Sequence, residues 1–438
     1  MNTRVVAVPH SGDPLGSFDD SKDPLARLEH WHISPDAKDA VATLTPAAEY
    51  LRTKDTPVAF PTETVYGLGA DATRSASVKG IYSAKGRPSD NPLIVHVSDL
   101  HMLRSLLGSQ DESAIPARYK SLIKRFWPGP LTILLPNPDP SPLAPEVTAG
   151  LKSFGVRMPS SPLALTLIKL AGVPLAAPSA NASTKPSPTM AQHVKDDLDG
   201  RIELILDGGS CEVGVESTVV DGLCDPPVVL RPGGVGIDEL RSCPGWEDVV
   251  KAYKDQSEEG KAAPRAPGMK YKHYSPKARV VLYESSYKDG REGIVRADAE
   301  AVAAATNGDS HAVNGSGRKK VGVIRTKRWK PAAGLRCSKL ELYARQNGHS
   351  QQNGYHDETS FDVYMGDLQN GQGDAIGQIF DISLGGETRG IAQGLFSALR
   401  ELDRRGADII FVDGIDDELD IAAAVMNRLR KAASETRA

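Results

Sequence analysis

The chain has 438 residues, of which 40% are hydrophobic and 25% charged, and its formal net charge at pH 7 is -4. This length exceeds what one ordinary hydrophobic core covers and predicts two or three domains. The small negative charge excludes a global basic field, so any contact with an anion or a nucleic acid has to come from a local patch.

The N-terminus and the cysteines predict a soluble, cytoplasmic protein without membrane contact. MNTRVVAVPHSGDP fits neither a secretory signal nor an Arg-rich transit peptide, and no apolar run approaches the length of a membrane span. A second pool in mitochondria stays open as an alternative. Cys211, Cys224, Cys243 and Cys337 show neither C-x-x-C nor paired His spacing, so neither a zinc site nor a disulfide scaffold is indicated.

The first 245 residues predict an arm followed by an α/β domain. Residues 1–40 are polar and contain Pro and Gly, which favours an extended N-terminal arm. Thr45 followed by Pro46 predicts a helix that begins there, with Thr45 as its cap. Within residues 41–245, short apolar runs then alternate with amphipathic segments. The predicted strands are VAF, PLIVHV, LTILL, FGVRM, PLAAPS, IELILDG, STVVDG and PVVLR, and the predicted helices cover 98–107, 116–126, 161–171 and 189–198.

The remaining chain predicts a linker and a second, smaller α/β unit. Residues 246–278 are charged, but GMKYKHY places aromatic rings between cations, which a plain spacer does not need. In residues 279–438 the predicted elements follow the order β-α-β and the strands are apolar, which favours a parallel, Rossmann-like sheet. The expected elements are RVVLYES, a strand at 321–326, a helix at 388–405, a strand at 407–415 and a helix at 418–432. TNGDSHAVNGSGR and RQNGHSQQNGYHD are expected to form flexible surface loops.

Two familiar nucleotide motifs do not explain the sequence. No G-x-x-x-x-G-K-[ST] occurs, which argues against a P-loop. GLGADA at 67–72 matches G-x-G-x-x-A, but Pro-Thr-Glu-Thr precedes it in place of a strand. The acidic residue near the required spacing is Asp90, in a Pro-flanked turn, so a dinucleotide fold is disfavoured.

Polar and cationic side chains instead recur where predicted strands end. AKGRPSDNPLIVH alone contains Lys85, Arg87, Asn91 and His96 within thirteen residues. The further members are Thr62, Thr64, Ser153, Arg157, Ser179, Asn181, Ser187, Ser217, Thr218 and Arg231. Each alone is equally explained by turn chemistry, a solvated charge or a core histidine. Their convergence in one domain favours a ligand that carries phosphates or a carboxylate.

Several motifs together resemble one family. PTETVYGLGADA, KGRPSDNPLIVH, WPGPLTILL, FGVRMPSSPLA, PLAAPSANASTKPSPT, ESTVVDG and RPGG, in this order, are similar to the threonylcarbamoyl-adenylate synthase family and its YrdC-type catalytic domain. PGMKYKHYSP and the downstream unit resemble the two-domain, fungal-like branch of that family. The resemblance implies an α/β fold: a YrdC-like domain with a twisted open sheet, plus a smaller Rossmann-like parallel α/β domain.

The resemblance also implies an activity. Such enzymes condense L-threonine, bicarbonate or CO2, and ATP into threonylcarbamoyl-AMP and release pyrophosphate. The product serves the N6-threonylcarbamoyl modification of adenosine in tRNAs that read codons starting with A. We expect Mg²⁺ to enter with ATP and without protein side-chain ligands. We also expect the product to pass to a tRNA threonylcarbamoyl-transferase complex, with weak or indirect contact to tRNA.

Residue roles follow by resemblance. The implied threonine contacts are Thr64, His96, Arg157, the backbone at Ala177, and Ser217. The implied ATP contacts are Lys85, Arg87, Asn91, Ser153, Ser179, Ser187 and Arg231. Lys85 and Arg157 are the expected catalytic residues. The linker is expected to act as a lid through Lys270, Tyr271, Lys272, His273 and Tyr274.

Two alternatives remain at this stage. Residues 79–131 contain eight Lys/Arg against four Asp/Glu, so an RNA-binding YrdC-like module without adenylation activity is one alternative. Its basic surface would be the helix that carries Arg118, Lys120, Lys124 and Arg125. Carbamoyl transfer in hydrogenase maturation is the other, although the zinc-finger cysteines that usually accompany it are absent from the sequence.

Overall fold

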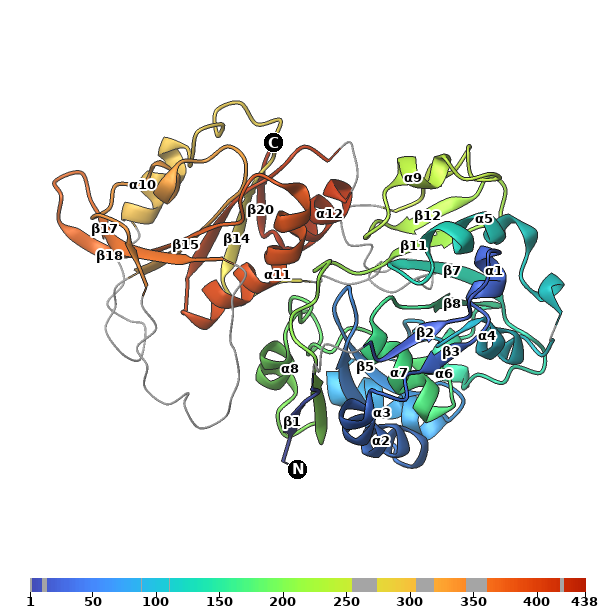
Figure 1. Ribbon diagram of the computed structural model, residues 1–438. Coiled ribbons are helices and arrows are strands. Elements are labelled where there is room, and N and C mark those ends of the chain that lie inside the picture. Colours follow the sequence, from blue (N-terminus) through green and yellow to red (C-terminus); the bar gives the residue numbers. More distant parts are fainter. Residues whose placement is uncertain are drawn as a thin grey trace. The chain divides into compact units, whose positions relative to one another are not determined.

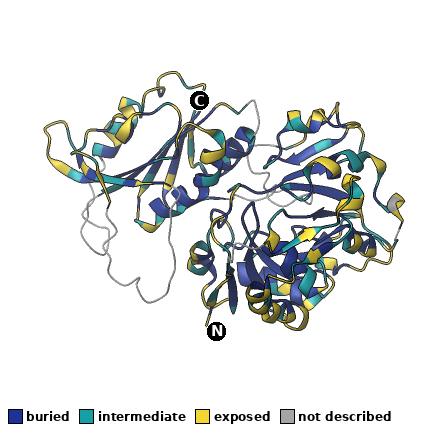
Figure 2. Ribbon diagram, viewed as in Figure 1, coloured by how far each residue is buried: buried dark blue, intermediate teal, exposed yellow. Residues whose placement is uncertain are grey.

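The computed structural model describes residues 2–9, 14–87, 89–109, 111–253, 274–304, 319–343, 361–417 and 421–438. The chain divides into two compact units, one formed mainly by residues before position 274 and the other by residues from 274 on. Figure 2 shows that the strands of both units are largely buried, whereas exposed residues gather on helix surfaces and loops. In these described ranges no helix has both the length and the apolar composition that crossing a membrane requires.

The first unit contains most of the predicted elements (Figure 1). Its strands are β1 (Arg4–Ala7), β2 (Gly16–Phe18), β3 (Trp31–Ile33), β4 (Val58–Pro61), β5 (Tyr66–Asp71), β6 (Ile94–His96), β7 (Leu131–Pro136), β8 (Ser153–Arg157), β9 (Leu175–Ala176), β10 (Leu204–Asp207), β11 (Thr218–Asp221), β12 (Val228–Arg231) and β13 (Val250–Lys251). Its helices are α1 (Pro24–Arg27), α2 (Lys38–Thr53), α3 (Ser75–Lys85), α4 (Leu100–Leu106), α5 (Ala117–Phe126), α6 (Pro145–Thr148), α7 (Pro162–Ala171), α8 (Ala191–Leu198) and α9 (Ile237–Arg241), with a short 3-10 helix at Glu112–Ala114. The predicted helices at 98–107, 116–126, 161–171 and 189–198 are confirmed to within about two residues at each end.

One mixed sheet runs through the first unit. Its strand order is β1-β10-β4-β5-β9-β6-β8-β7-β11-β12-β13. The sheet contains both parallel pairs, such as β6 with β8, and antiparallel pairs, such as β7 with β8. The pairing of β6 with β8 sets His96 beside Arg157 at the ends of both strands. The predicted α/β domain with an open sheet is confirmed, and its register brings two predicted site residues together.

The predicted N-terminal arm is instead part of the first unit. β1 pairs in parallel with β10, with Arg4 opposite Leu204, and forms an edge of the main sheet. Trp31 is 4% exposed, and its indole Nε1 donates to Thr166 Oγ1 at 3.1 Å. The apolar strand β1 and the buried Trp31 thus attach residues 1–40 to the first unit.

The expected helix start at Thr45 is wrong. α2 begins at Lys38 and contains Pro46 in its interior. Thr45 Oγ1 donates to the Val41 carbonyl at 2.7 Å rather than capping a helix. An interior proline costs about 3 kcal/mol, and the buried face formed by Ala40, Leu44, Ala47, Ala48 and Leu51 offsets that cost by packing into the core.

The predicted linker is shorter at its N-terminal end than 246–278. Trp246 is fully buried, and Val250 in β13 pairs with Val228 in β12. Residues up to 251 therefore belong to the sheet of the first unit. Residues 254–273 lie outside the described part of the chain.

The second unit has a seven-stranded sheet in the described residues, with the order β16-β17-β18-β15-β19-β14-β20. Its elements are β14 (Arg279–Tyr283), α10 (Arg296–Ala304), β15 (Lys319–Arg325), a 3-10 helix (Pro331–Gly334), β16 (Glu341–Leu342), β17 (Val363–Gln369), β18 (Ala375–Ser383), α11 (Thr388–Arg404), β19 (Ile409–Asp413), α12 (Ala422–Ala432) and β20 (Glu435–Arg437). β14, β15 and β19 are parallel, as predicted, and the parallel strands β18 and β20, which were not predicted, extend the same sheet. The antiparallel strands β16 and β17 were not predicted. The two expected loops, 306–318 and 345–357, lie outside the described residues.

Candidate active site

Arg157 is the centre of a buried polar cluster in the first unit. It ends β8 and is 3% exposed. Its Nη1 donates to Thr64 Oγ1 at 2.8 Å, and its Nε donates to the Gly129 carbonyl at 3.1 Å. Its Nη2 forms an ion pair with Glu63 Oε1. Two residues predicted to bind threonine, Thr64 and Arg157, therefore lie in direct contact.

Glu63 is a member of this cluster that the sequence did not identify. It lies in the turn between β4 and β5, is 6% exposed, and carries a second oxygen, Oε2, that has no hydrogen-bond partner in the described residues. Burial, helped by the charge of Glu63, raises the pKa of the nearby Cys211 thiol well above its usual range. Cys211 is therefore protonated at neutral pH.

His96 lies beside Arg157 in the strand register. It is 4% exposed, and its Nδ1–H donates to the Ile94 carbonyl at 3.2 Å. Burial, together with the charge of Arg157, lowers the pKa of His96 to about 3, although the carbonyls of Ile94 and Leu175 act in the opposite direction. The imidazole is therefore neutral at pH 7 and can serve as a hydrogen-bonding group without adding charge.

Ser217 and Arg231 form a second cluster. Ser217 Oγ lies 2.8 Å from Thr132 Oγ1. Arg231 Nη2 donates to Ser217 Oγ at 3.1 Å and to the Ser217 carbonyl at 3.0 Å. Gly233 permits this approach, because a Cβ on it would lie 2.2 Å from the Ser217 carbonyl carbon. A predicted threonine contact and a predicted ATP contact thus touch each other.

Lys85 organises a third cluster at the end of α3. Lys85 is 3% exposed, and its ammonium donates to the Ser179 carbonyl, and to the carbonyl and side-chain oxygen of Asn181 at 2.7 and 3.4 Å. Ser179 Oγ donates to the same Asn181 oxygen at 2.6 Å. Lys85 therefore holds the 179–181 turn in place, in addition to any contact with phosphate.

Arg87 and Asn91 follow α3. The helix ends at Gly86 in the left-handed conformation, with φ 61°, which glycine adopts without strain. The side-chain amide of Asn91 is fully buried, yet neither its nitrogen nor its oxygen has a partner among the described residues. An unmade hydrogen bond of a buried amide costs about 1–3 kcal/mol. Such an amide is better explained by a ligand that completes it than by packing alone.

The other predicted binding residues are less informative. Ala177 donates its backbone N–H to the Ile94 carbonyl at 3.0 Å, so this N–H is engaged within the fold. Ser187 Oγ donates to the buried Glu216 carboxylate. Ser153 starts β8 opposite Pro136 and is partly exposed.

Of the predicted lid residues, the structure describes Tyr274. It is 6% exposed and has φ 66°. Its ring stacks on Phe396 of α11 with centroids 5.2 Å apart, and the Arg428 guanidinium lies 5.7 Å from the ring centroid. Tyr274 is thus fixed to the second unit. Lys270, Tyr271, Lys272 and His273 lie outside the described residues.

A cavity of about 240 Å³ borders the Arg157 cluster. Its polar lining consists of Thr62, Glu63, Ser160, Ser161, Ser210 and Glu212. It adjoins the cluster through Glu63 and contains none of the described residues that were predicted to bind threonine or ATP.

The helix that an RNA-binding surface would use is partly engaged within the fold. In α5, Arg118 Nη1 donates to the carbonyls of Gly222 and Cys224 at 3.2 and 2.9 Å, and its Nη2 pairs with Asp225. Arg125 donates to Ser242 Oγ. These two cations secure α5 to the loops around it, and Asp225 offsets the charge of Arg118.

Comparison with protein families identifies both units. Residues 51–233 match the family model Sua5_yciO_yrdC, described as "Telomere recombination". Residues 235–434 match a model described as "Threonylcarbamoyl-AMP synthase, C-terminal domain". The two models together cover almost all of the chain.

Relatives match along nearly their whole length. The chain is 43% identical over 433 residues to the threonylcarbamoyl-AMP synthase of Schizosaccharomyces pombe, covering 94% of both chains. It is 40% identical to the Bacillus subtilis enzyme of the same name, covering 93% of this chain and 98% of that one. Among solved structures, a Pyrococcus abyssi Sua5 variant matches with TM-score 0.70 at 35% identity, covering 99% of this chain and 98% of that one. Sua5 from the same organism, in complex with L-threonine, matches with TM-score 0.68 at 34% identity over 99% of each chain. The chain therefore belongs to the threonylcarbamoyl-AMP synthase family of nucleotidyltransferases, in its two-domain form.

Proposed function

We propose that this chain condenses L-threonine, bicarbonate or CO2, and ATP into threonylcarbamoyl-AMP and pyrophosphate. The observation that carries the proposal is the Arg157 guanidinium. It is buried next to the neutral His96, and three of its five N–H groups donate to described residues. Two N–H groups remain for a carboxylate, which a planar guanidinium binds in a fork. The Sua5 structure in complex with L-threonine supports threonine as the amino acid that this chain binds.

The reaction requires positioning and charge neutralisation more than covalent catalysis. The neutral threonine amine attacks the carbon of CO2 and loses a proton, which gives a carbamate; when bicarbonate is the source of this carbon, one C–O bond breaks and water leaves. The resulting carbamate oxygen attacks the α-phosphorus in line, and pyrophosphate leaves. In the proposed site Arg157 and Thr64 hold threonine, while Lys85, Arg87 and Arg231 lie on the side of the phosphates. Such fixed cations lower the barrier by stabilising charge that develops on the transferred phosphoryl group.

Magnesium fits this donor set as a companion of ATP. The proposed ATP contacts are cations, hydroxyls and an amide, which match a triphosphate whose ion is held by phosphate oxygens and water. When bound, Mg²⁺ neutralises part of the triphosphate charge. The orphaned Asn91 amide would then bind a polar group of the nucleotide.

The product defines the wider role that we propose. Threonylcarbamoyl-AMP is an activated acyl phosphate that hydrolyses unless a transferase takes it, so we propose delivery to a tRNA threonylcarbamoyl-transferase complex in the cytoplasm. The acceptor would be the adenosine of tRNAs that read codons starting with A. Contact with tRNA by this chain would be weak or indirect.

A pyrophosphate-release assay tests the reaction. The purified chain is given ATP and Mg²⁺ with each of the twenty amino acids in turn, with and without bicarbonate. Release is expected with threonine and bicarbonate together. Release that ignores threonine, or that proceeds in solutions stripped of bicarbonate and CO2, would refute the assignment. RNA binding with a steep salt dependence and no release would instead favour the RNA-binding alternative.

A further inference from the structure

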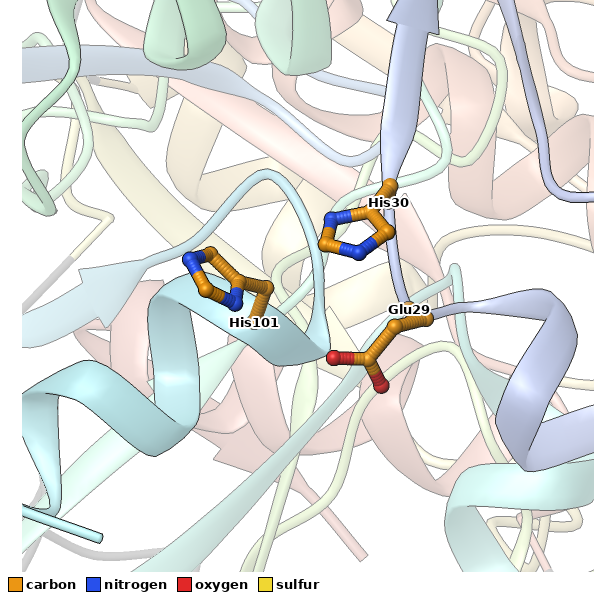
Figure 3. Close-up of side chains that lie close together, drawn as sticks. All are labelled: Glu29, His30 and His101. Carbon is orange, nitrogen blue, oxygen red and sulfur yellow. The ribbon is translucent and has the colours of Figure 1, made fainter. Parts of the chain in front are cut away.

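A cluster of three potential metal ligands lies in the first unit and contains none of the residues of the candidate active site. Glu29, His30 and His101 each offer a ligand atom, and these atoms lie within 4.8 Å of one another. Figure 3 shows the two imidazole rings and the carboxylate gathered around one gap. Glu29 and His30 come from the segment between α1 and β3, and His101 comes from the first turn of α4. We propose that this cluster binds one divalent transition-metal ion of the zinc type.

The backbone that carries the three ligands is already fixed. The Leu100 N–H donates to the Leu28 carbonyl at 2.9 Å, and the His101 N–H donates to the Glu29 carbonyl at 3.1 Å. The Trp31 N–H donates to Asp99 Oδ2 at 3.2 Å. These bonds hold residues 28–31 beside residues 99–101, on either side of the three ligands. Binding an ion at such a place requires little ordering of the chain.

The donor set selects the class of ion. Two imidazoles and one carboxylate suit zinc and its neighbours, whereas Mg²⁺ and Ca²⁺ prefer oxygen ligands alone. Ligands at 2.0–2.1 Å from a tetrahedral zinc ion lie about 3.4 Å apart, so small side-chain rotations would close the present gap. The centroids of the His30 and His101 rings are 5.1 Å apart, which allows both rings to face one ion.

Arg104 forms an ion pair with the carboxylate of Glu29. It is 8% exposed, and its Nη2 pairs with Glu29 Oε1. A carboxylate has two oxygens with about four lone-pair sites, so Oε2 stays suitable for a metal while Oε1 is held. Residues that orient a ligand in this way typically contribute about tenfold to a hundredfold to metal affinity. His101 is exposed, so water can occupy the fourth position.

The site would differ in role from the Mg²⁺ proposed for ATP. The cluster lies on the segment around Trp31, whose indole is anchored to Thr166 in the core. A bound ion would cross-link this N-terminal segment to α4 and stabilise the first unit, because any ligand that binds only the folded chain stabilises it. No step of the adenylation reaction depends on it.

Metal titration of the full chain tests the proposal. The chain is treated with a chelator and dialysed, and Zn²⁺ affinity is then measured by competition with a chromogenic chelator. Co²⁺ is used in parallel, because its visible absorption reports nitrogen and oxygen ligands directly. His30→Ala and His101→Ala are each expected to lower the affinity of this site at least tenfold and to remove the Co²⁺ band. His32→Ala is the matched control, because His32 lies two residues from His30 but pairs with Asp19 instead.

A second readout separates binding from folding. Zn²⁺ is expected to raise the melting temperature of the native chain and of His32→Ala, and to leave that of His30→Ala and His101→Ala unchanged. Circular dichroism without metal should be the same for all four proteins. The proposal is overturned if the His30 and His101 variants bind Zn²⁺ as tightly as the control, or if Zn²⁺ stabilises them equally.

Discussion

The neutral state of His96 makes the stability of the first unit depend on pH. Its pKa is lowered to about 3 by burial and by Arg157, whereas in the unfolded chain it is about 6.5. The unfolded chain therefore binds a proton that the folded chain excludes. It follows that His96 contributes stability above pH 6.5, and that this contribution is lost as the pH falls from 6.5 towards 3.

The size of the effect follows from the two pKa values. Between pH 8 and pH 5 the unfolded imidazole becomes almost fully protonated, while the folded one stays neutral. Each pKa unit corresponds to about 1.36 kcal/mol, so this residue alone should remove about 2 kcal/mol from the free energy of unfolding. Other carboxylates and histidines titrate as well, and a matched variant is needed to isolate the contribution of His96.

His96→Asn is that variant. Its side-chain amide can still donate to the Ile94 carbonyl, which accepts from His96 Nδ1 in the structure, but it does not titrate. Urea unfolding measures the free energy of unfolding at each pH. Between pH 8 and pH 5 we expect this free energy to fall by about 2 kcal/mol more for the native chain than for His96→Asn. Equal losses in the two proteins would refute this reasoning. A titration of the folded chain followed by NMR, in which the His96 imidazole shows a pKa near 6.5, would refute this reasoning as well.

Three further predictions test the site. Arg157→Lys keeps a positive charge opposite Glu63 but loses the planar guanidinium that can bind a carboxylate with two N–H groups. The affinity for threonine, measured by titration, should therefore fall about tenfold or more, while the affinity for ATP is retained. An equal loss of both affinities would contradict the proposed threonine role. Asn91→Leu removes an amide whose two polar atoms lack partners among the described residues. Without ligand, the free energy of unfolding in urea should therefore be equal or greater in this variant, while its affinity for ATP falls. Unchanged affinity for ATP would contradict the proposed nucleotide role. Gly233→Ala places a Cβ 2.2 Å from the backbone of Ser217 and should lower the melting temperature through a loss of about 1–3 kcal/mol. Gly371→Ala, where a Cβ meets nothing within 4 Å, is its control, and equal melting temperatures would contradict the packing argument.

Periodicity predicted the elements whose burial pattern is regular. α7, for example, buries most of its residues between a serine cap, Ser161, and the left-handed Gly172, and both ends are visible in the sequence. β5 was missed because Gly67 and Gly69 make it read as a ligand-binding loop. In the structure a Cβ on Gly69 would lie 2.5 Å from the Phe60 ring, so this glycine permits packing between β4 and β5 rather than the approach of a ligand.

The sequence singled out most members of the cluster around Arg157, but not the contacts between them. The strand-end pattern and the family resemblance singled out Thr64, His96 and Arg157. Neither signal revealed the ion pair between Glu63 and Arg157, which lie 94 residues apart and are brought together by the fold. In the same way, the sequence suggests a phosphate contact for Lys85, whereas the structure shows its ammonium on the carbonyls of the 179–181 turn.

The hydrogen bond between Arg231 and Ser217 would connect the two proposed substrate sites. Arg231 is proposed to bind ATP and Ser217 to bind threonine, and Arg231 Nη2 donates to Ser217 Oγ at 3.1 Å. A nucleotide that draws the guanidinium towards its phosphates would change the hydrogen-bond partner of the serine, and with it the free energy of binding threonine. Thermodynamic linkage then requires reciprocity: by whatever factor ATP alters the affinity for threonine, threonine alters the affinity for ATP by the same factor.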